Sequence, residues 1–376
     1  MVPAPRRRRC FQSEIVRMEN SHEKPPKPVV LVVGAGASKE VNLPLGADLT
    51  RQIARVTGSL DGRGFSTNEQ AFQEALQYLA SSNGRVEGEA LNKLYRACRH
   101  IRDAMPQAPS IDNFINTHRD KPHTTACAKL AIARSILRAE EGSALMVDRN
   151  RGVREVDFDA VRGTWFDAFF QRINVDCLDR ELPSRLSKIA VINFNYDRCL
   201  EHFLHASLRN YFGLAEGEAT ETLSHLEILH PYGKVGNLPW QAEGEAIAFG
   251  GSPSGAQLLS LSRQLRTFHE DVSPQTRDID EIRRLAREAE QLVFLGFAYH
   301  QINLDLLFDP MASVETPRRL PRIYGTAFGM SPSDVEDVRQ TLSSRLKVVP
   351  EAMAIRSDLT CGKLFSEYHR GLSLPR

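Results

Sequence analysis

Five consecutive apolar residues, Val29-Val30-Leu31-Val32-Val33, are followed directly by Gly34-Ala35-Gly36. Four of the five are valines, and β-branched side chains favour a strand over a helix. A strand that is apolar at every position is buried on both faces, as in a parallel sheet covered by helices on each side. This segment therefore indicates an α/β fold in which the glycines follow the carboxyl end of a strand.

Later parts of the chain repeat the alternation of strand and helix patterns. Four further strands are expected at residues 189–194, 226–230, 292–295 and 322–326. Apolar residues recur every three to four positions in residues 48–56, 71–79, 90–101, 126–137, 153–173, 199–208, 257–268 and 278–289. Strands that alternate with helices predict an α/β fold with a Rossmann-like, doubly wound parallel sheet.

The same patterns predict how the chain is divided. One domain of residues 29–376 is expected, with a large helical module inserted at about residues 66–186 and a C-terminal extension from about residue 330 to 376. Residues 1–28 are rich in Pro and Arg, and we expect them to form a disordered basic tail.

Composition argues against several classes of protein. The chain of 376 residues has a net charge of +1, so no overall field attracts nucleic acid or a membrane, and direct nucleic-acid binding is not expected. The six cysteines form no C-x-x-C pair, which argues against a zinc ribbon and fits a reducing compartment. No apolar run approaches the roughly 20 residues of a membrane span. We expect a cytoplasmic protein with no bound metal.

Polar groups at the strand ends are the first candidates for a site, because ligands of open α/β sheets bind outside the carboxyl ends of the strands. In Gly34-Ala35-Gly36-Ala37-Ser38, glycine allows a phosphate to approach the backbone, although a plain tight turn has the same pattern. The third glycine of the dinucleotide fingerprint is missing, and no acidic residue ends a second strand about 20 residues later. A standard dehydrogenase is therefore excluded.

The other strand ends carry further candidates. Asn195 and Asp197 follow the second strand, where the amide could hold a water or a ribose hydroxyl, while Asp197 could equally cap the next helix. His230 ends the third strand and could act as a general base, although a lone histidine is more often structural. Gly296 ends the fourth strand. Asp112 lies where a helix would begin, so capping by Ser110 or Asp112 is the alternative there.

Taken in order, these motifs resemble a sirtuin-like domain of the bacterial anti-phage NADase branch. The matching segments are Gly34-Ala35-Gly36-Ala37-Ser38, Asn42-Leu43-Pro44, Ser110-Ile111-Asp112-Asn113-Phe114, Asn195-Tyr196-Asp197, His230-Pro231-Tyr232-Gly233 and Gly296-Phe297-Ala298-Tyr299. The resemblance spans about residues 29–330, with long unmatched helical stretches between the motifs. It implies that NAD+ is bound as a substrate between the sheet and a smaller module.

The resemblance also implies roles for individual residues. It places Gly34, Ala35, Gly36 and Ser38 at the pyrophosphate, Asn195 at the scissile bond, Asp197 by the nicotinamide amide, and Gly296 and Phe297 at the adenosine half. Pro44, Asp112 and Tyr232 are further expected contacts of the dinucleotide. The zinc cysteines of the deacylase sirtuins are absent. Tyr232 precedes Gly233 where the family has histidine, and we expect His230, on the same side of the chain, to be the base.

The activity that this resemblance implies is hydrolysis of NAD+ to nicotinamide and ADP-ribose, as the effector of abortive-infection defence against phage. Restraint of such an activity implies a homo-oligomer, or a partner subunit such as a HerA-type ATPase or an Argonaute-like protein. A non-catalytic subunit that binds NAD or ADP-ribose is the first alternative. A protein deacylase is the second, and the missing zinc cysteines argue against it.

Overall fold

The computed structural model describes residues 27–59, 69–147, 156–241, 244–266, 277–310 and 320–374. Apart from residues 27 and 28, the expected basic tail lies outside these ranges. Within the described residues, no helix combines the length and the apolar character that crossing a bilayer requires.

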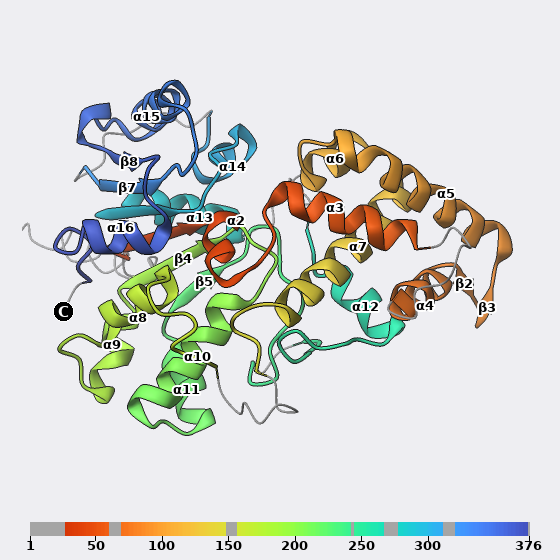
Figure 1. Ribbon diagram of the computed structural model, residues 1–376, viewed down its shortest axis with the longest axis horizontal. Helices are drawn as coiled ribbons and strands as arrows, with labels where there is room; N and C mark the ends of the chain where they lie inside the picture. Colours follow the sequence, from red (N-terminus) through yellow and green to blue (C-terminus); the bar gives the residue numbers. More distant parts are fainter. Residues whose placement is uncertain are drawn as a thin grey trace, which may run out of the picture.

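A six-stranded parallel sheet forms the centre of the molecule (Figure 1). Its strands are β1 (Val29–Val33), β4 (Ile189–Asn193), β5 (Glu227–Leu229), β6 (Gln291–Leu295), β7 (Arg322–Thr326) and β8 (Ala354–Arg356). Their order across the sheet is β5-β4-β1-β6-β7-β8, and every neighbouring pair is parallel. This order is that of a doubly wound Rossmann-type sheet, so the predicted α/β class is confirmed.

Side chains of β1 alternate between two apolar cores. Val30 and Val32 belong to one cluster of buried residues, whereas Val29, Leu31 and Val33 belong to the other. Successive side chains of a strand point to opposite faces of a sheet, so each face of β1 is covered. This explains why the strand is apolar at every position.

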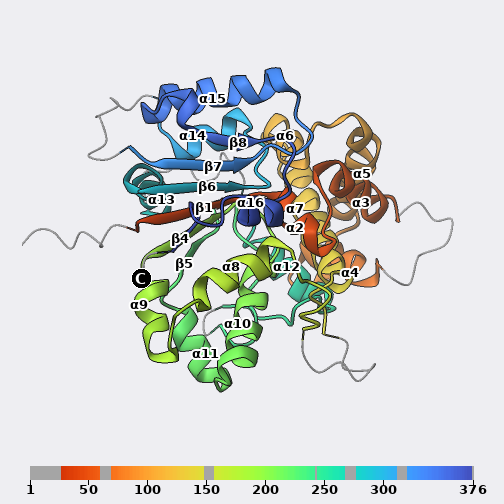
Figure 2. The same cartoon turned by 60° about the vertical axis from the view of Figure 1, so that its left-hand side comes forward.

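Helices cover both faces of the sheet (Figures 1 and 2). Residues of α8 (Trp165–Asn174), α9 (Leu182–Leu186), α10 (Cys199–Phe212), α11 (Glu216–Leu223) and α16 (Cys361–Glu367) share a core with Val29, Leu31 and Val33. Residues of α13 (Arg277–Glu288), α14 (Gln301–Leu307) and α15 (Pro332–Leu346) share the other core. Helices on both faces remove every apolar side chain of the central strands from water.

A lobe of helices lies beyond the carboxyl ends of the strands, on the right in Figure 2. It contains α3 (Gly46–Gly58), α4 (Gln70–Leu79), α5 (Gly88–Ala104), α6 (Ile111–Thr117), α7 (Pro122–Glu141), α12 (Gly255–Ser262) and the short hairpin of β2 (Ser81–Ser82) and β3 (Arg85–Val86). We call this group the helical lobe.

The helical lobe differs in extent from the predicted module of residues 66–186. It begins earlier, at α3, and it includes α12 from a much later part of the chain, which packs on α4 and α7. In contrast, α8 and α9 pack on the sheet, where Trp165 and Phe169 are fully buried. Likewise, β8 and α15 of the expected C-terminal extension belong to the sheet and its cover. An apolar stripe shows that a helix packs, but not which partner it packs against.

Candidate functional site

The strand-end motifs meet at one edge of the sheet because all six strands run in the same direction. The chain passes from β1 to β4 and β5 on one side, and then returns to β6, β7 and β8 on the other side of β1. The carboxyl ends of β1 and β6 therefore flank the point where the strand order reverses, which is where ligands bind in open α/β sheets.

Two glycine turns interlock at this point. The Gly34 N–H donates to Leu295 O and the Gly36 N–H donates to Gly296 O, each at 2.9 Å. Gly296 has a φ of +57°, and a Cβ added there would lie 2.0 Å from the Ala37 nitrogen. A Cβ on Gly36 would lie 2.7 Å from the Gly296 Cα. Contact between two backbones thus requires these glycines independently of any phosphate.

The short helix α2 (Ala35–Ser38) that follows β1 is held from outside the sheet. The Trp165 indole N–H donates to Ala37 O at 3.0 Å. The Glu40 carboxylate accepts from the Trp165 N–H at 2.7 Å and from the Gly362 N–H at 2.9 Å. Glu40 thus joins the first turns of α8 and α16 to the glycine turn, while Ala35 itself is exposed. Sequence reasoning did not identify Glu40 or Trp165 in this role.

Asn195 is fixed against the glycine turn. Its side-chain Nδ2 donates to Gly34 O at 3.1 Å and to the Ser38 Oγ at 3.0 Å. Its backbone N–H donates to the Asn193 Oδ1 at 3.1 Å. Because the amide nitrogen is used by the protein, the Oδ1 remains as the acceptor that a ligand hydroxyl or a water can use.

Asp197 lies beside Asn195 and is 4% exposed. Burial raises the pKa of its carboxyl to about 6, although hydrogen bonds from Cys199 and Ser38 lower it and the charge of Glu140 raises it further. Its Oδ1 accepts from the Cys199 N–H at 3.1 Å, so Asp197 satisfies the first N–H of α10, although the N-cap residue of this helix is Arg198. A carboxyl with this pKa is ionised at neutral pH and is a far better proton acceptor than an ordinary aspartate.

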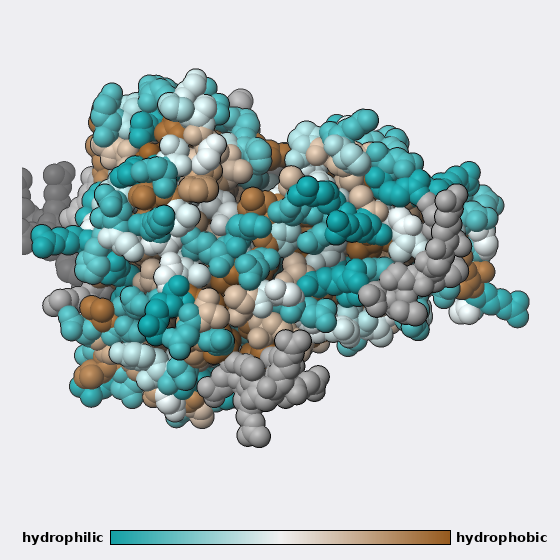
Figure 3. Space-filling view, in the orientation of Figure 1, coloured by the Kyte–Doolittle hydropathy of each residue, from teal (hydrophilic) through white to brown (hydrophobic). Residues whose placement is uncertain are grey.

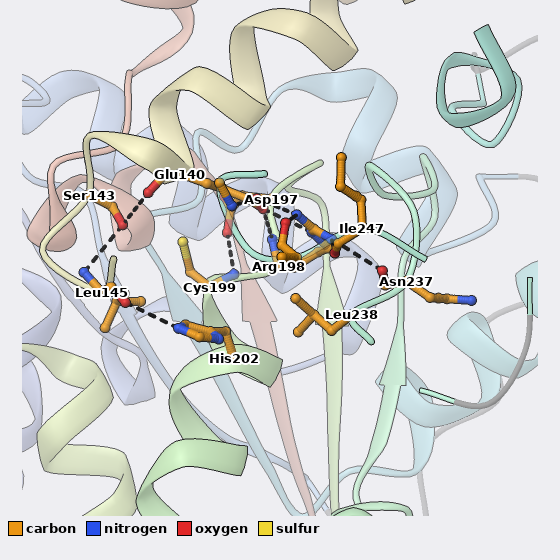
Figure 4. A network of polar contacts seen from close by, with 12 residues as sticks. Glu140, Ser143, Leu145, Asp197, Arg198, Cys199, His202, Asn237, Leu238 and Ile247 are labelled. Atoms are coloured by element: carbon orange, nitrogen blue, oxygen red, sulfur yellow. Dashed lines mark hydrogen bonds and ion pairs between the residues drawn. The ribbon is translucent and has the colours of Figure 1, made fainter. Parts of the chain in front are cut away.

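Figure 4 shows a buried ion pair next to Asp197. Arg198 and Glu140 are both fully buried, and their side chains form two hydrogen bonds, at 3.1 Å and 2.5 Å. Glu140 also accepts from the Arg198 and Gly250 N–H groups, each at 3.0 Å, and Arg198 donates to the Ile247 carbonyl at 2.7 Å. The pair therefore joins α7 of the helical lobe to the segment after β4. Its partners are far apart in sequence, and sequence reasoning did not find it.

Both ring nitrogens of His230 are engaged. The Nδ1 lies 3.1 Å from the Asn195 carbonyl oxygen, and the Nε2 lies 3.0 Å from the Glu201 Oε1. Burial raises the pKa of Glu201, but the charges of His230 and Lys234 outweigh it and bring that pKa to about 2. A carbonyl and a carboxylate can only accept, so both contacts are satisfied by a ring with N–H on each nitrogen. In this arrangement His230 has no free nitrogen for the expected role of base.

Tyr232 and Asp112 are brought to the same edge. The Tyr232 hydroxyl donates to the Asn303 Oδ1 at 2.6 Å, and its ring packs on Phe194 with the centroids 5.7 Å apart. The Tyr196 hydroxyl donates to Asp112, which is exposed on α6, where Ser110 caps the helix. Desolvation by the surrounding protein raises the pKa of Asp112, although the Tyr196 hydrogen bond lowers it.

Phe297 and Pro44 differ in their exposure. Phe297 is 3% exposed, and its ring packs on Phe194 with the centroids 5.1 Å apart, so it supports the edge from inside rather than facing a ligand. Pro44 is partly exposed in the loop before α3. The Gly296 N–H donates to the Thr326 Oγ1 at 2.8 Å, which fixes the turn from the side of β7.

The surface is hollowed between the sheet and the helical lobe, in the region of α6 and α14 (Figure 3).

Direct contacts bring together six of the predicted site residues, namely Gly34, Ser38, Asn195, Asp197, His230 and Gly296. Aromatic side chains connect Asp112 and Tyr232 to this group. Among the described residues, no group of three or more His, Cys, Asp or Glu side chains could hold a metal ion. Comparisons with protein-family models, curated proteins and solved structures find no match to this chain.

Proposed function

We propose that this chain is a sirtuin-like NAD+ hydrolase whose site is the carboxyl edge of the sheet, at the reversal of strand order. The observation that carries the proposal is the Asn195 amide, whose nitrogen is fixed on Gly34 and Ser38 while its oxygen stays available. An amide acceptor at this edge suits a ribose hydroxyl or a water better than it suits a phosphate.

In the proposed placement, NAD+ lies across the carboxyl ends of β4, β1 and β6. The pyrophosphate lies over the exposed Ala35 of the glycine turn. The nicotinamide ribose lies on the β4 side, beside Asn195, and the adenosine half lies on the β6 side, near Gly296. Asp112, on α6 of the helical lobe, is exposed and accepts from the Tyr196 hydroxyl. Phe297 supports the edge from within its aromatic cluster.

The chemistry requires few protein groups. The bond between nicotinamide nitrogen and ribose C1′ breaks, its electron pair leaves with neutral nicotinamide, and water adds to C1′ to give ADP-ribose. In the proposed mechanism Asn195 holds the water, and Asp197 takes the proton that the water loses, because both nitrogens of His230 are engaged. Positioning and proton removal account for such a reaction without a covalent intermediate.

The decisive experiment compares NAD+ binding and nicotinamide release in the wild type and in Asn195→Ala. We expect the variant to bind NAD+ by calorimetry and to release no nicotinamide by liquid chromatography. Asn92→Ala, an exposed asparagine of α5, is the matched control and should behave as the wild type. Release at the wild-type rate by Asn195→Ala would refute the assignment of the site.

A non-catalytic NAD or ADP-ribose subunit is the second candidate, and one observation favours it. His230 presents no free nitrogen, and the hydroxyl of Tyr232 is held by Asn303. A protein that binds NAD+ with micromolar or tighter affinity, yet releases no nicotinamide even with its neighbouring gene products added, would belong to this class.

The biological part of the proposal extends the resemblance described above. NAD+ depletion would serve cytoplasmic anti-phage defence by abortive infection, with a homo-oligomer or a HerA-type or Argonaute-like partner restraining the activity. Measuring NAD+ turnover with and without the products of neighbouring genes tests this part. Constitutive turnover by a strictly monomeric protein in light scattering would contradict it.

A further inference from the structure

We propose that Glu201 is a positioning residue of this site, and that it acts through His230 on Asn195. The proposal rests on the proposed NAD+ hydrolysis and adds to it the control of the Asn195 conformation. Three segments meet here: Glu201 lies on α10, His230 follows β5, and Asn195 follows β4.

The three groups form a buried chain of hydrogen bonds. The Glu201 carboxylate accepts from the His230 Nε2 at 3.0 Å, and the His230 Nδ1 donates to the Asn195 carbonyl at 3.1 Å. The side chain of His230 is 8% exposed and that of Glu201 is 3% exposed. With the bonds from Asn195 to Asn193, Gly34 and Ser38, the His230 bond fixes both the backbone and the side chain of Asn195.

The setting of Glu201 indicates a role other than stability. Its second oxygen, Oε2, is buried and has no hydrogen-bond partner among the described residues. A buried carboxylate with one unsatisfied oxygen costs free energy that an apolar side chain of similar size would avoid. The remaining oxygen, Oε1, is shared by His230 and Lys234.

Glu201 fixes the orientation of the His230 imidazole ring. An imidazole can turn about χ2 between two broad, nearly equivalent orientations unless a partner fixes one of them. The carboxylate selects the orientation in which the Nδ1–H faces the Asn195 carbonyl. Without the Glu201 carboxylate, the ring can turn away and the hydrogen bond to the Asn195 carbonyl is lost. We expect Asn195 then to shift slightly, and a shift of about 1 Å in a positioning group is enough to lower the rate of a reaction strongly.

Two substitutions test this role. Glu201→Leu removes every partner of the His230 Nε2, and we expect kcat for nicotinamide release to fall about tenfold to hundredfold, with the Kd for NAD+ changed less than about twofold. Glu201→Gln retains an amide that can hydrogen bond to the Nε2, so we expect kcat to return to within about threefold of the wild type. Lys234→Met is the control, because it removes the other ion pair of Glu201 without touching the ring.

A spectroscopic measurement tests the geometry in the wild-type protein itself. Nitrogen spectra of histidine-labelled wild type, with the His230 signals identified by their loss in His230→Gln, should show a proton on the Nδ1, the nitrogen that faces the Asn195 carbonyl. An Nδ1 without a proton would overturn the proposal, as would equal kcat in Glu201→Leu and the wild type. No nicotinamide release from the wild type would instead overturn the proposed function, and this role with it.

Discussion

The side-chain amide of Asn195 donates to the carbonyl oxygen of Gly34 at 3.1 Å, so the residue after β4 and the residue after β1 are joined directly. A parallel sheet makes such a contact possible, because the ends of adjacent strands lie side by side. The same amide donates to the Ser38 Oγ at 3.0 Å. The glycine turn and the candidate catalytic asparagine therefore form one structural unit, and a change in either should affect both.

Gly296→Ala should destabilise the protein and abolish NAD+ binding. The added Cβ would lie 2.0 Å from the Ala37 nitrogen, at a residue with a φ of +57°. Backbone strain and a clash between two backbones together are expected to cost more than about 2 kcal/mol of unfolding free energy. Urea denaturation measures this loss. Gly217→Ala, on α11 with no atom within 4 Å of the added Cβ, should unfold at nearly the wild-type midpoint.

Nicotinamide release should lose rate as the pH falls through about 6. The proposed proton acceptor is Asp197, whose pKa burial raises to about 6, and only the ionised carboxylate can take a proton. The rate should therefore be close to its plateau at pH 7.5 and fall about tenfold for each pH unit well below 6. Steady-state rates between pH 4.5 and 8.5 test this. A flat profile through pH 6 would assign the proton to another group.

Asp197→Asn should become increasingly stabilising, relative to the wild type, as the pH rises. The folded-state pKa of about 6 lies above the ordinary 3.8, so protonation favours the folded state. The contribution of this group to stability is complete below pH 3.8 and is lost as the pH rises through 6. Asparagine is neutral throughout, so the difference in unfolding free energy should grow by up to about 3 kcal/mol between pH 4 and pH 8. Urea denaturation of both proteins across this pH range measures the difference. A difference in unfolding free energy between the variant and the wild type that stays constant with pH would contradict the prediction.

Glu140→Gln should destabilise the protein strongly, because it leaves the fully buried Arg198 without its charged partner. Removing one member of a buried ion pair costs about 3 to 5 kcal/mol of unfolding free energy. Thermal denaturation followed by circular dichroism measures the loss. The exposed neighbour Glu141→Gln is the control and should leave the midpoint within about a degree. Equal midpoints for the two variants would show that the pair does not hold the lobe to the sheet.

Patterns that are local in sequence predicted most of the sheet. The run at β1 and the similar runs at β4 and β6 are apolar at every position, since these strands are buried on both faces. The edge strand β8 has three residues, of which only Ile355 is buried, so its sequence resembles a loop. A short edge strand lacks the continuous apolar run on which the prediction depends.

The candidate site was predictable only in part, for a similar reason. Asn195, Asp197 and His230 could be found because polar residues directly after apolar strands are conspicuous in a sequence. The partners that set their chemistry, Glu201 and Glu140, lie on helices at positions with no distinguishing local pattern. Pairing between distant segments depends on the packing of helices against the sheet, which periodicity does not determine.

The order in which the chain emerges from the ribosome gives the position of β1 a further consequence. Val33 pairs with Asn193 on one side and with Leu295 on the other. The Glu40 carboxylate accepts from the Gly362 N–H, which lies much later in the sequence. The central strand β1 therefore cannot be enclosed until β4 and β6 have been synthesised, because these partners are distant from it in sequence. The interlocked glycine turns of the candidate site need Leu295 and Gly296, so a nascent chain that ends before β6 cannot form this site.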